Sequence, residues 1–324
     1  MQGRDARRSD HLSATRAAGA SDIDQQSLVL RTLPPGLRPY ARLARLDRPI
    51  GTWLLLLPCW HGLGLAIAAG AAPLDYRAFL YALLFAVGAL AMRGAGCVLN
   101  DIADRNFDGR VARTALRPIP AGEVSVKQAV AFMALLTAIG AAVLFQFNLA
   151  TILIGLASLP LIAIYPFMKR VTWWPQFFLG LAFNWGALVG WAALAGGLSA
   201  PPLLLYLAGI FWTLGYDTIY ACQDKEDDAL IGVKSTARLF GANARRWIVA
   251  FYGAMLGWLL LAGFVGGVHW AYLGGLAVVA WRLMDQATRT DLESPAACLK
   301  AFRSNRDVGL LLLAAMLVAA LVAG

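Results

Sequence analysis

Long apolar runs recur along the whole chain and constrain it more than any other feature. Nine runs approach or exceed the length that crosses a hydrocarbon core of about 30 Å, and short charged segments separate them. Because 59% of the residues are hydrophobic and only 15% are charged, an ordinary soluble domain is excluded. The pattern predicts an all-α integral membrane protein with about nine transmembrane helices in a bundle. The expected spans are residues 50–72, 79–99, 128–147, 149–167, 175–197, 202–222, 247–266, 268–281 and 308–323.

The net charge of +9 does not indicate nucleic acid, because the basic residues follow the membrane pattern. Of 28 Lys and Arg residues, 26 fall on one face of a nine-span arrangement. The positive-inside rule makes that face cytoplasmic, with the amino terminus inside and the carboxyl terminus outside. We therefore expect membrane lipid around this chain and no nucleic acid among its partners.

Residues 1–37 are polar and carry no apolar stretch typical of a secretory signal. We expect a disordered cytoplasmic tail there, followed by one transmembrane domain over residues 38–324. A mitochondrial transit peptide is the alternative, but the segment contains four aspartates and such peptides are poor in acids. The sequence therefore favours a bacterial inner membrane, with the active site facing the cytoplasm, over a mitochondrial inner membrane.

Acidic residues gather in two short stretches that end even-numbered spans. Eight of the 19 acids lie there, and both stretches fall on the basic face. Their equivalent placement predicts two pseudo-repeated halves, each with an acidic motif at the same point of its helices. The members are Asp101, Asp104 and Asp108 after the second span, and Asp217, Asp224, Glu226, Asp227 and Asp228 at the end of the sixth.

Helical spacing would align these acids into stripes. If the helix continues past the lipid boundary, Asn100, Asp104 and Asp108 share one face with about 6 Å of rise between neighbours. Asp217, Asp224 and Asp228 would form a second stripe. Carboxylates so placed repel by roughly 3 kcal/mol per pair at an effective dielectric near 20, so a cation is expected between them. Oxygen ligands that leave sites free for water and phosphate indicate Mg²⁺.

Basic residues lie close to both motifs in the sequence. A diphosphate bound to metal would need such donors, because its charge can then be shared between cations and guanidinium or ammonium groups. The alternative is that these are solvated loops whose acids merely balance their bases. The candidate diphosphate contacts are Arg113, Arg117, Lys169, Arg170 and Lys234.

The two motifs resemble those of the UbiA prenyltransferase superfamily. Residues 100–118 fit its Asn-Asp-x2-Asp-x3-Asp signature and the Arg-Thr-x2-Arg-Pro that follows, and residues 216–236 fit its second aspartate motif. Residues 43–62, 165–170 and, more weakly, 297–302 resemble the 4-hydroxybenzoate branch. The resemblance covers the chain from about residue 38 onward.

This resemblance implies a nine-helix bundle with a cavity that opens to lipid, and a magnesium-dependent enzyme of ubiquinone biosynthesis. Its substrates would be polyprenyl diphosphate and 4-hydroxybenzoate, which is prenylated ortho to the hydroxyl. A naphthoate or haem acceptor remains an alternative within the family. The positions that match the family's magnesium-holding residues are Asn100, Asp104, Asp108, Asp224 and Asp228.

Arg93 and Asp217 are the candidate catalytic residues outside the metal set. Each lies seven residues before a residue of its motif, on the same helix face and about 10 Å deeper. In one interpretation Arg93 holds the acceptor's carboxylate while Asp217 orients or deprotonates its phenol. In the other they pair with each other and are only structural. Arg45 and Arg48 are further candidates for the carboxylate.

Two other classes of membrane protein also carry acidic residues in or beside their spans. A phosphatidyl-type phosphotransferase also places aspartates at a helix end, but three of its four metal-binding positions fall here on Arg105, Val126 and Val130. An ion-coupled transporter would hold its acids near the bilayer midplane, whereas these lie at helix ends beside bases. Phosphate chemistry is favoured over both.

Overall fold

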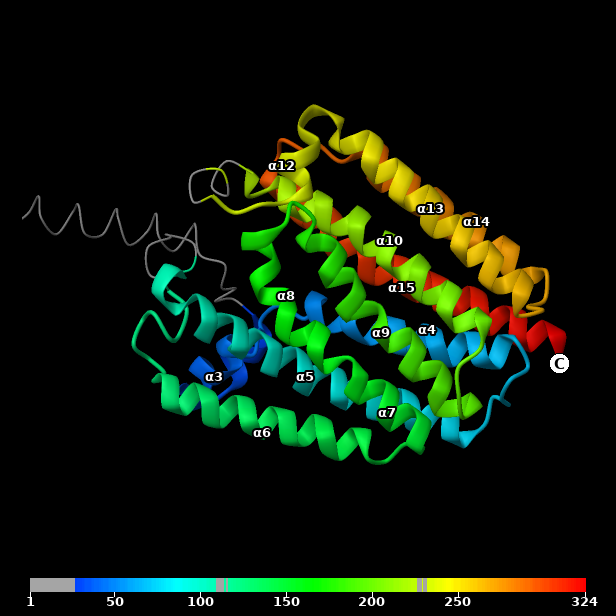
Figure 1. Ribbon diagram of the computed structural model, residues 1–324, viewed down its shortest axis with the longest axis horizontal. Helices are drawn as coiled ribbons and strands as arrows, with labels where there is room; N and C mark the ends of the chain where they lie inside the picture. Colours follow the sequence, from blue (N-terminus) through cyan, green and yellow to red (C-terminus); the bar gives the residue numbers. More distant parts are fainter. Residues whose placement is uncertain (1–26, 109–113, 115, 226–228, 230–231) are drawn as a thin grey trace, which may run out of the picture. The chain divides into compact units, whose positions relative to one another are not determined.

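The computed structural model describes residues 27–108, 114, 116–225, 229 and 232–324, without the side chains of residues 106–108. Within these ranges every regular element is a helix, which confirms the all-α prediction (Figure 1). The elements are α2 (Leu28–Thr32), η1 (Pro35–Leu37), α3 (Arg38–Leu43), α4 (Ile50–Ala68), α5 (Tyr76–Asp108), α6 (Val126–Leu144), α7 (Leu149–Ala157), α8 (Leu159–Val171), α9 (Pro175–Ala195), α10 (Ala200–Cys222), α12 (Thr236–Phe240), η2 (Gly241–Asn243), α13 (Ala244–Val265), α14 (Ala271–Arg289) and α15 (Pro295–Ala323).

Eight helical segments of the described residues are long and apolar enough to cross a membrane, where the sequence predicted about nine. One of the eight joins α7 and α8, which break at Ser158 because Pro160 lacks an amide hydrogen for the helix ladder. The expected span at 268–281 corresponds to α14. That helix has 19 residues but includes Arg282, Asp285 and Arg289, which lower its apolarity.

The chain forms two compact units. Of the described residues, the first unit contains those within 27–51 and 90–141, and the second contains those within 52–89 and 142–324. In the first unit, Leu43 packs with apolar side chains of α5 and α6 around the fully buried Val98. Helical structure begins ahead of residue 38, with α2. Its residue Leu30 is buried in a small apolar cluster with Ala41. Residues 28–37 of the predicted tail are therefore structured.

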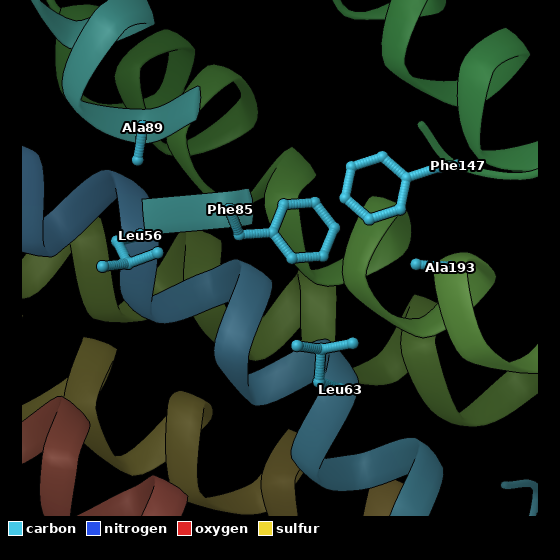
Figure 2. Packing of buried hydrophobic residues seen from close by; sticks show 6 residues of the cluster. All are labelled: Leu56, Leu63, Phe85, Ala89, Phe147 and Ala193. Carbon is cyan, nitrogen blue, oxygen red and sulfur yellow. The ribbon is translucent and has the colours of Figure 1, made fainter. Parts of the chain in front are cut away.

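The second unit is a bundle of packed helices. Helix α10 contacts α9, α13 and α15, and α14 packs on α13 and α15 (Figure 1). One apolar cluster joins Leu56 and Leu63 of α4 to Phe85 of α5 and Ala193 of α9. Figure 2 shows the rings of Phe85 and Phe147 next to each other in this cluster. Their planes are nearly parallel, at 15°, and their centroids are 4.6 Å apart. Their burial removes large apolar areas from solvent and fixes the helices laterally.

Glycines allow α4 and α9 to approach closely within the second unit. A Cβ at Gly190 would lie 2.1 Å from the backbone oxygen of Cys59. We expect Gly190→Ala to destabilise the protein by about 1–3 kcal/mol, because backbone atoms cannot yield as a side chain does. Thermal unfolding in one detergent would measure this. Gly257→Ala on α13 is the matched control, since no atom lies within 4 Å of its Cβ, and an unchanged midpoint for Gly190→Ala would contradict the packing.

Candidate active site

The first acidic motif lies on the last turns of α5. This helix is 33 residues long and continues to Asp108, so Asn100 and Asp104 share one face as predicted. Asn100 is partly exposed, and Asp104 is only 6% exposed. An amide oxygen and a carboxylate one helical turn apart are both oxygen donors of the kind that Mg²⁺ accepts.

Asp101 has a different environment from its neighbours in the motif. Its carboxylate accepts hydrogen bonds from Arg45 at 2.9 Å and from Arg117 at 3.1 Å, and it is fully buried. Arg45 has a φ of 57°, in the left-handed region where a residue with a side chain is strained. The ion pair with the buried Asp101 holds Arg45 in place. Asp101 thus anchors two guanidinium groups, one of which, Arg117, is a candidate diphosphate contact.

Arg93 lies deeper on α5 and packs against the start of α4. A Cβ at Gly51 would be 2.4 Å from Nε of Arg93, so only glycine leaves room for the guanidinium in this position. Arg93 is partly exposed. It belongs to the first unit and Asp217 to the second, so their pairing stays a prediction.

The second acidic motif begins on α10 and continues beyond it. Asp217 lies within the helix and is partly exposed. Helix α10 ends at Cys222, so Asp224 lies in the following turn and not on a continuous helical stripe as expected.

Three of the predicted basic residues come together in the second unit. Lys169 and Arg170 form the last turn of α8. The backbone amide of Lys234 donates to the carbonyl of Lys169 at 3.1 Å, and its ammonium donates to the carbonyl of Val171 at 3.1 Å. A cation at the end of a helix also interacts favourably with the helix dipole. The segment after the second motif is thereby joined to the end of α8.

The aromatic residues near the second motif differ in exposure. Trp212 and Tyr216 are each 2% exposed, and the indole of Trp212 donates to Asn305 at 2.9 Å, so packing explains them. Tyr220 and Phe302 are partly exposed, with ring centroids 4.4 Å apart. Tyr220 lies three residues after Asp217 on α10 and hence on a neighbouring position of the same face. Tyr220 and Phe302 are therefore accessible to a ligand, whereas Trp212 and Tyr216 are not.

Several predicted residues lie outside the described part of the chain. These are Arg113, Asp228 and the side chain of Asp108. Among the side chains that are described, no three His, Cys, Asp or Glu residues form a group that could hold a metal ion. The complete ligand set therefore stays a prediction.

Sequence reasoning missed a set of buried polar residues beside the second motif. Thr218, Thr236 and Gln176 are hydrogen-bonded to one another across three helices. The only signal in the sequence was the position of Thr218 next to Asp217, and of Thr236 at the end of the motif. Threonine and glutamine carry no spacing signature that would have identified the contact.

The fold and these residues define a helical membrane protein with acids and bases at helix ends that suit a substrate bearing phosphate. The comparisons agree with this class. The chain matches the UbiA prenyltransferase family over residues 55–313, and it belongs to that family.

Curated relatives are similar over most of the chain. The mitochondrial 4-hydroxybenzoate polyprenyltransferase of Rattus norvegicus is 50% identical over 88% of this chain and 75% of its own length. The enzyme of the same name from Arabidopsis thaliana is 46% identical over 89% of this chain and 70% of its own length.

Solved structures of the family share the fold. The apo structure of a UbiA homologue from Aeropyrum pernix aligns with a TM-score of 0.69 and 25% identity, over 82% of this chain and 97% of that one. A UbiA homologue from Archaeoglobus fulgidus, bound to GPP and Mg²⁺, aligns with a TM-score of 0.60 and 19% identity, over 87% of this chain and 99% of that one.

The expected location in a bacterial inner membrane is wrong. The curated relatives are mitochondrial enzymes, which favours a mitochondrial membrane. The positive-inside pattern distinguishes the two faces of a membrane and not the organelle that contains it, so that choice depended on four aspartates in the first 37 residues.

Proposed function

We propose that this chain transfers a polyprenyl group from polyprenyl diphosphate to 4-hydroxybenzoate, as a step of ubiquinone biosynthesis. The allylic C–O bond of the donor breaks, and a C–C bond forms at the ring carbon ortho to the hydroxyl. The ring loses a proton, and diphosphate is released. The observation that carries this proposal is the 46–50% identity to polyprenyltransferases of that name over nearly nine tenths of the chain.

Five residues of the two motifs would hold Mg²⁺ on the diphosphate. Their donor set of one amide and four carboxylates suits a hard cation, and the members Asn100 and Asp104 share one face of α5. Bound Mg²⁺ would supply neutralisation of the charge that develops on the departing diphosphate. The solved homologue with GPP and Mg²⁺ supports the cation for the family fold. The five are Asn100, Asp104, Asp108, Asp224 and Asp228.

Basic side chains would take up the remaining diphosphate charge. Charge-assisted hydrogen bonds from such groups are about twice as strong as neutral ones, and they act where charge develops in the transition state. Lys234 is hydrogen-bonded to the end of α8, next to Lys169 and Arg170. This proximity supports a shared role of the three residues in binding diphosphate. The proposed contacts are Arg113, Arg117, Lys169, Arg170 and Lys234.

Arg93 and Asp217 would serve the acceptor. Arg93 would hold the carboxylate of 4-hydroxybenzoate, and Asp217 would orient or deprotonate its phenol. Both lie within apolar helices, where an ionisable group is costly unless it has a function or a partner. The apolar surroundings would also exclude water, which otherwise consumes an allylic cation.

Product formation with three acceptors tests the proposal. The purified protein is incubated with a labelled polyprenyl diphosphate, Mg²⁺ and either 4-hydroxybenzoate, a naphthoate or haem. We expect efficient prenylation of 4-hydroxybenzoate alone, because the relatives that are 46–50% identical to this chain are named for that acceptor. Faster prenylation of the naphthoate or haem would assign the chain to another branch of the family.

A further inference from the structure

A buried hydrogen-bonded connection links the second motif to the bases at the end of α8. Thr236 and Thr218 are fully buried, and Gln176 is 4% exposed. The hydroxyls of the two threonines lie 2.7 Å apart, and the backbone amide of Thr236 donates to Oε1 of Gln176 at 3.2 Å. Three helices, α9, α10 and α12, are thus joined at one residue.

The direction of these hydrogen bonds follows from the number of hydrogens. The hydroxyl of Thr218 lies 2.6 Å from the carbonyl of Leu214 and has one hydrogen, which it donates there. It can then only accept from Thr236, so Thr236 donates twice, from its hydroxyl and from its backbone amide. Replacing Thr236 by an apolar residue would remove the first of these bonds and leave Thr218 without its donor.

Thr236 is also close in sequence to a proposed diphosphate contact. Lys234 lies two residues earlier, and its backbone amide and ammonium both donate to carbonyls at the end of α8. Ser235 between them is 3% exposed and caps α12 by accepting from the amide of Arg238. The segment 234–236 is therefore held at both ends, by α8 and by the buried side chains of α9 and α10.

We propose that Thr236 is a positioning residue for the diphosphate of the prenyl donor. Bonded to Thr218, the direct neighbour of Asp217, it fixes Lys234 and, through it, the basic last turn of α8 relative to the acidic motif of α10. The inference deepens the proposed function and rests on it. Because an anion is bound most strongly by charges that are already in place, a loosened segment weakens binding without loss of a charge.

The test compares Thr236→Val with Thr236→Ser in the full-length protein. Valine keeps the shape of threonine but lacks the hydroxyl, whereas serine keeps the hydroxyl. We expect Thr236→Val to raise both the KM for polyprenyl diphosphate and the inhibition constant of inorganic pyrophosphate, each about five- to tenfold. The loss of one hydrogen bond to a buried partner changes an equilibrium constant by about a factor of ten. The KM for 4-hydroxybenzoate should stay within about twofold, and Thr236→Ser should restore the wild-type values.

Thr151→Val is the matched control. Thr151 is also fully buried and hydrogen-bonded, to Asn148 at 3.1 Å, but it lies on α7. This variant should lose stability and keep all three constants. If Thr236→Val does not fold, Gln176→Leu removes the acceptor of the Thr236 amide and is measured in the same way.

Three results are distinguishable. Absence of prenyl transfer by the wild-type protein would overturn the proposed function itself. An active wild type with unchanged donor and pyrophosphate constants in the folded variant would overturn the role of Thr236 alone. An equal rise in the KM of both substrates would also overturn it, because general loosening would then explain the loss.

Discussion

Asp104→Asn should lower kcat/KM for prenyl transfer by about a thousandfold at saturating Mg²⁺. The substitution removes one charged ligand of the proposed cation and almost no volume. A metal ion contributes several kcal/mol of transition-state stabilisation, and about 4 kcal/mol corresponds to a factor of a thousand. Initial rates of 4-hydroxybenzoate prenylation by purified protein would measure the effect.

The control for Asp104→Asn is a substitution at Asp75, just before the amino-terminal end of α5. Asp75 accepts from the backbone amides of Arg77 and Ala78 at the start of α5, and asparagine can cap a helix equally well. Asp75→Asn should therefore keep full activity. If Asp104→Asn retained more than half of the wild-type rate, Asp104 would not be a metal ligand.

Arg93→Ala should raise the KM for 4-hydroxybenzoate by about ten- to a hundredfold and leave that for the prenyl donor within about twofold. The lost contact would be to the acceptor alone, and a hydrogen bond to a charged group is worth about 1.5–3 kcal/mol. Arg93→Lys should recover only part of the loss, since an ammonium cannot make a bidentate contact. Steady-state kinetics with each substrate varied in turn would show the difference.

Gly51→Ala provides a second test of Arg93 that keeps its charge. The new Cβ would overlap Nε of Arg93, so the guanidinium would have to move. We expect the KM for 4-hydroxybenzoate to rise several-fold with little loss of protein. Equal damage to both substrates by Arg93→Ala, together with a lower yield, would instead favour a structural pairing with Asp217.

The helical class could be predicted because the apolar runs leave few alternatives for a backbone in lipid. The stripe of Asn100 and Asp104 was also predictable, since it requires only that α5 continue past the apolar segment. The span expected at 268–281 is not among the eight apolar segments of the described residues, because α14 carries Arg282, Asp285 and Arg289. Charged residues in α14 pair with one another, Arg289 with Asp285 at 3.0 Å, and such pairing is invisible to a count of apolar residues.

Asp101 shows what spacing alone leaves undetermined. It is acidic and lies within the motif, yet it is rotated by about 100° from its neighbour Asn100 around the helix axis. The structure places two arginines there, from positions 56 and 16 residues away. Long-range partners of this kind, like Thr236 with Gln176, have no local signature in a single sequence.

The most direct test of the account is the product of a single incubation, analysed by mass spectrometry and NMR. Purified protein receives polyprenyl diphosphate and 4-hydroxybenzoate, with Mg²⁺ or with excess chelator. We predict a product carrying the prenyl group on the carbon ortho to the hydroxyl, formed with Mg²⁺ and lost on chelation. Substrates that remain covalently unchanged in the presence of Mg²⁺, or full turnover in excess chelator, would contradict it.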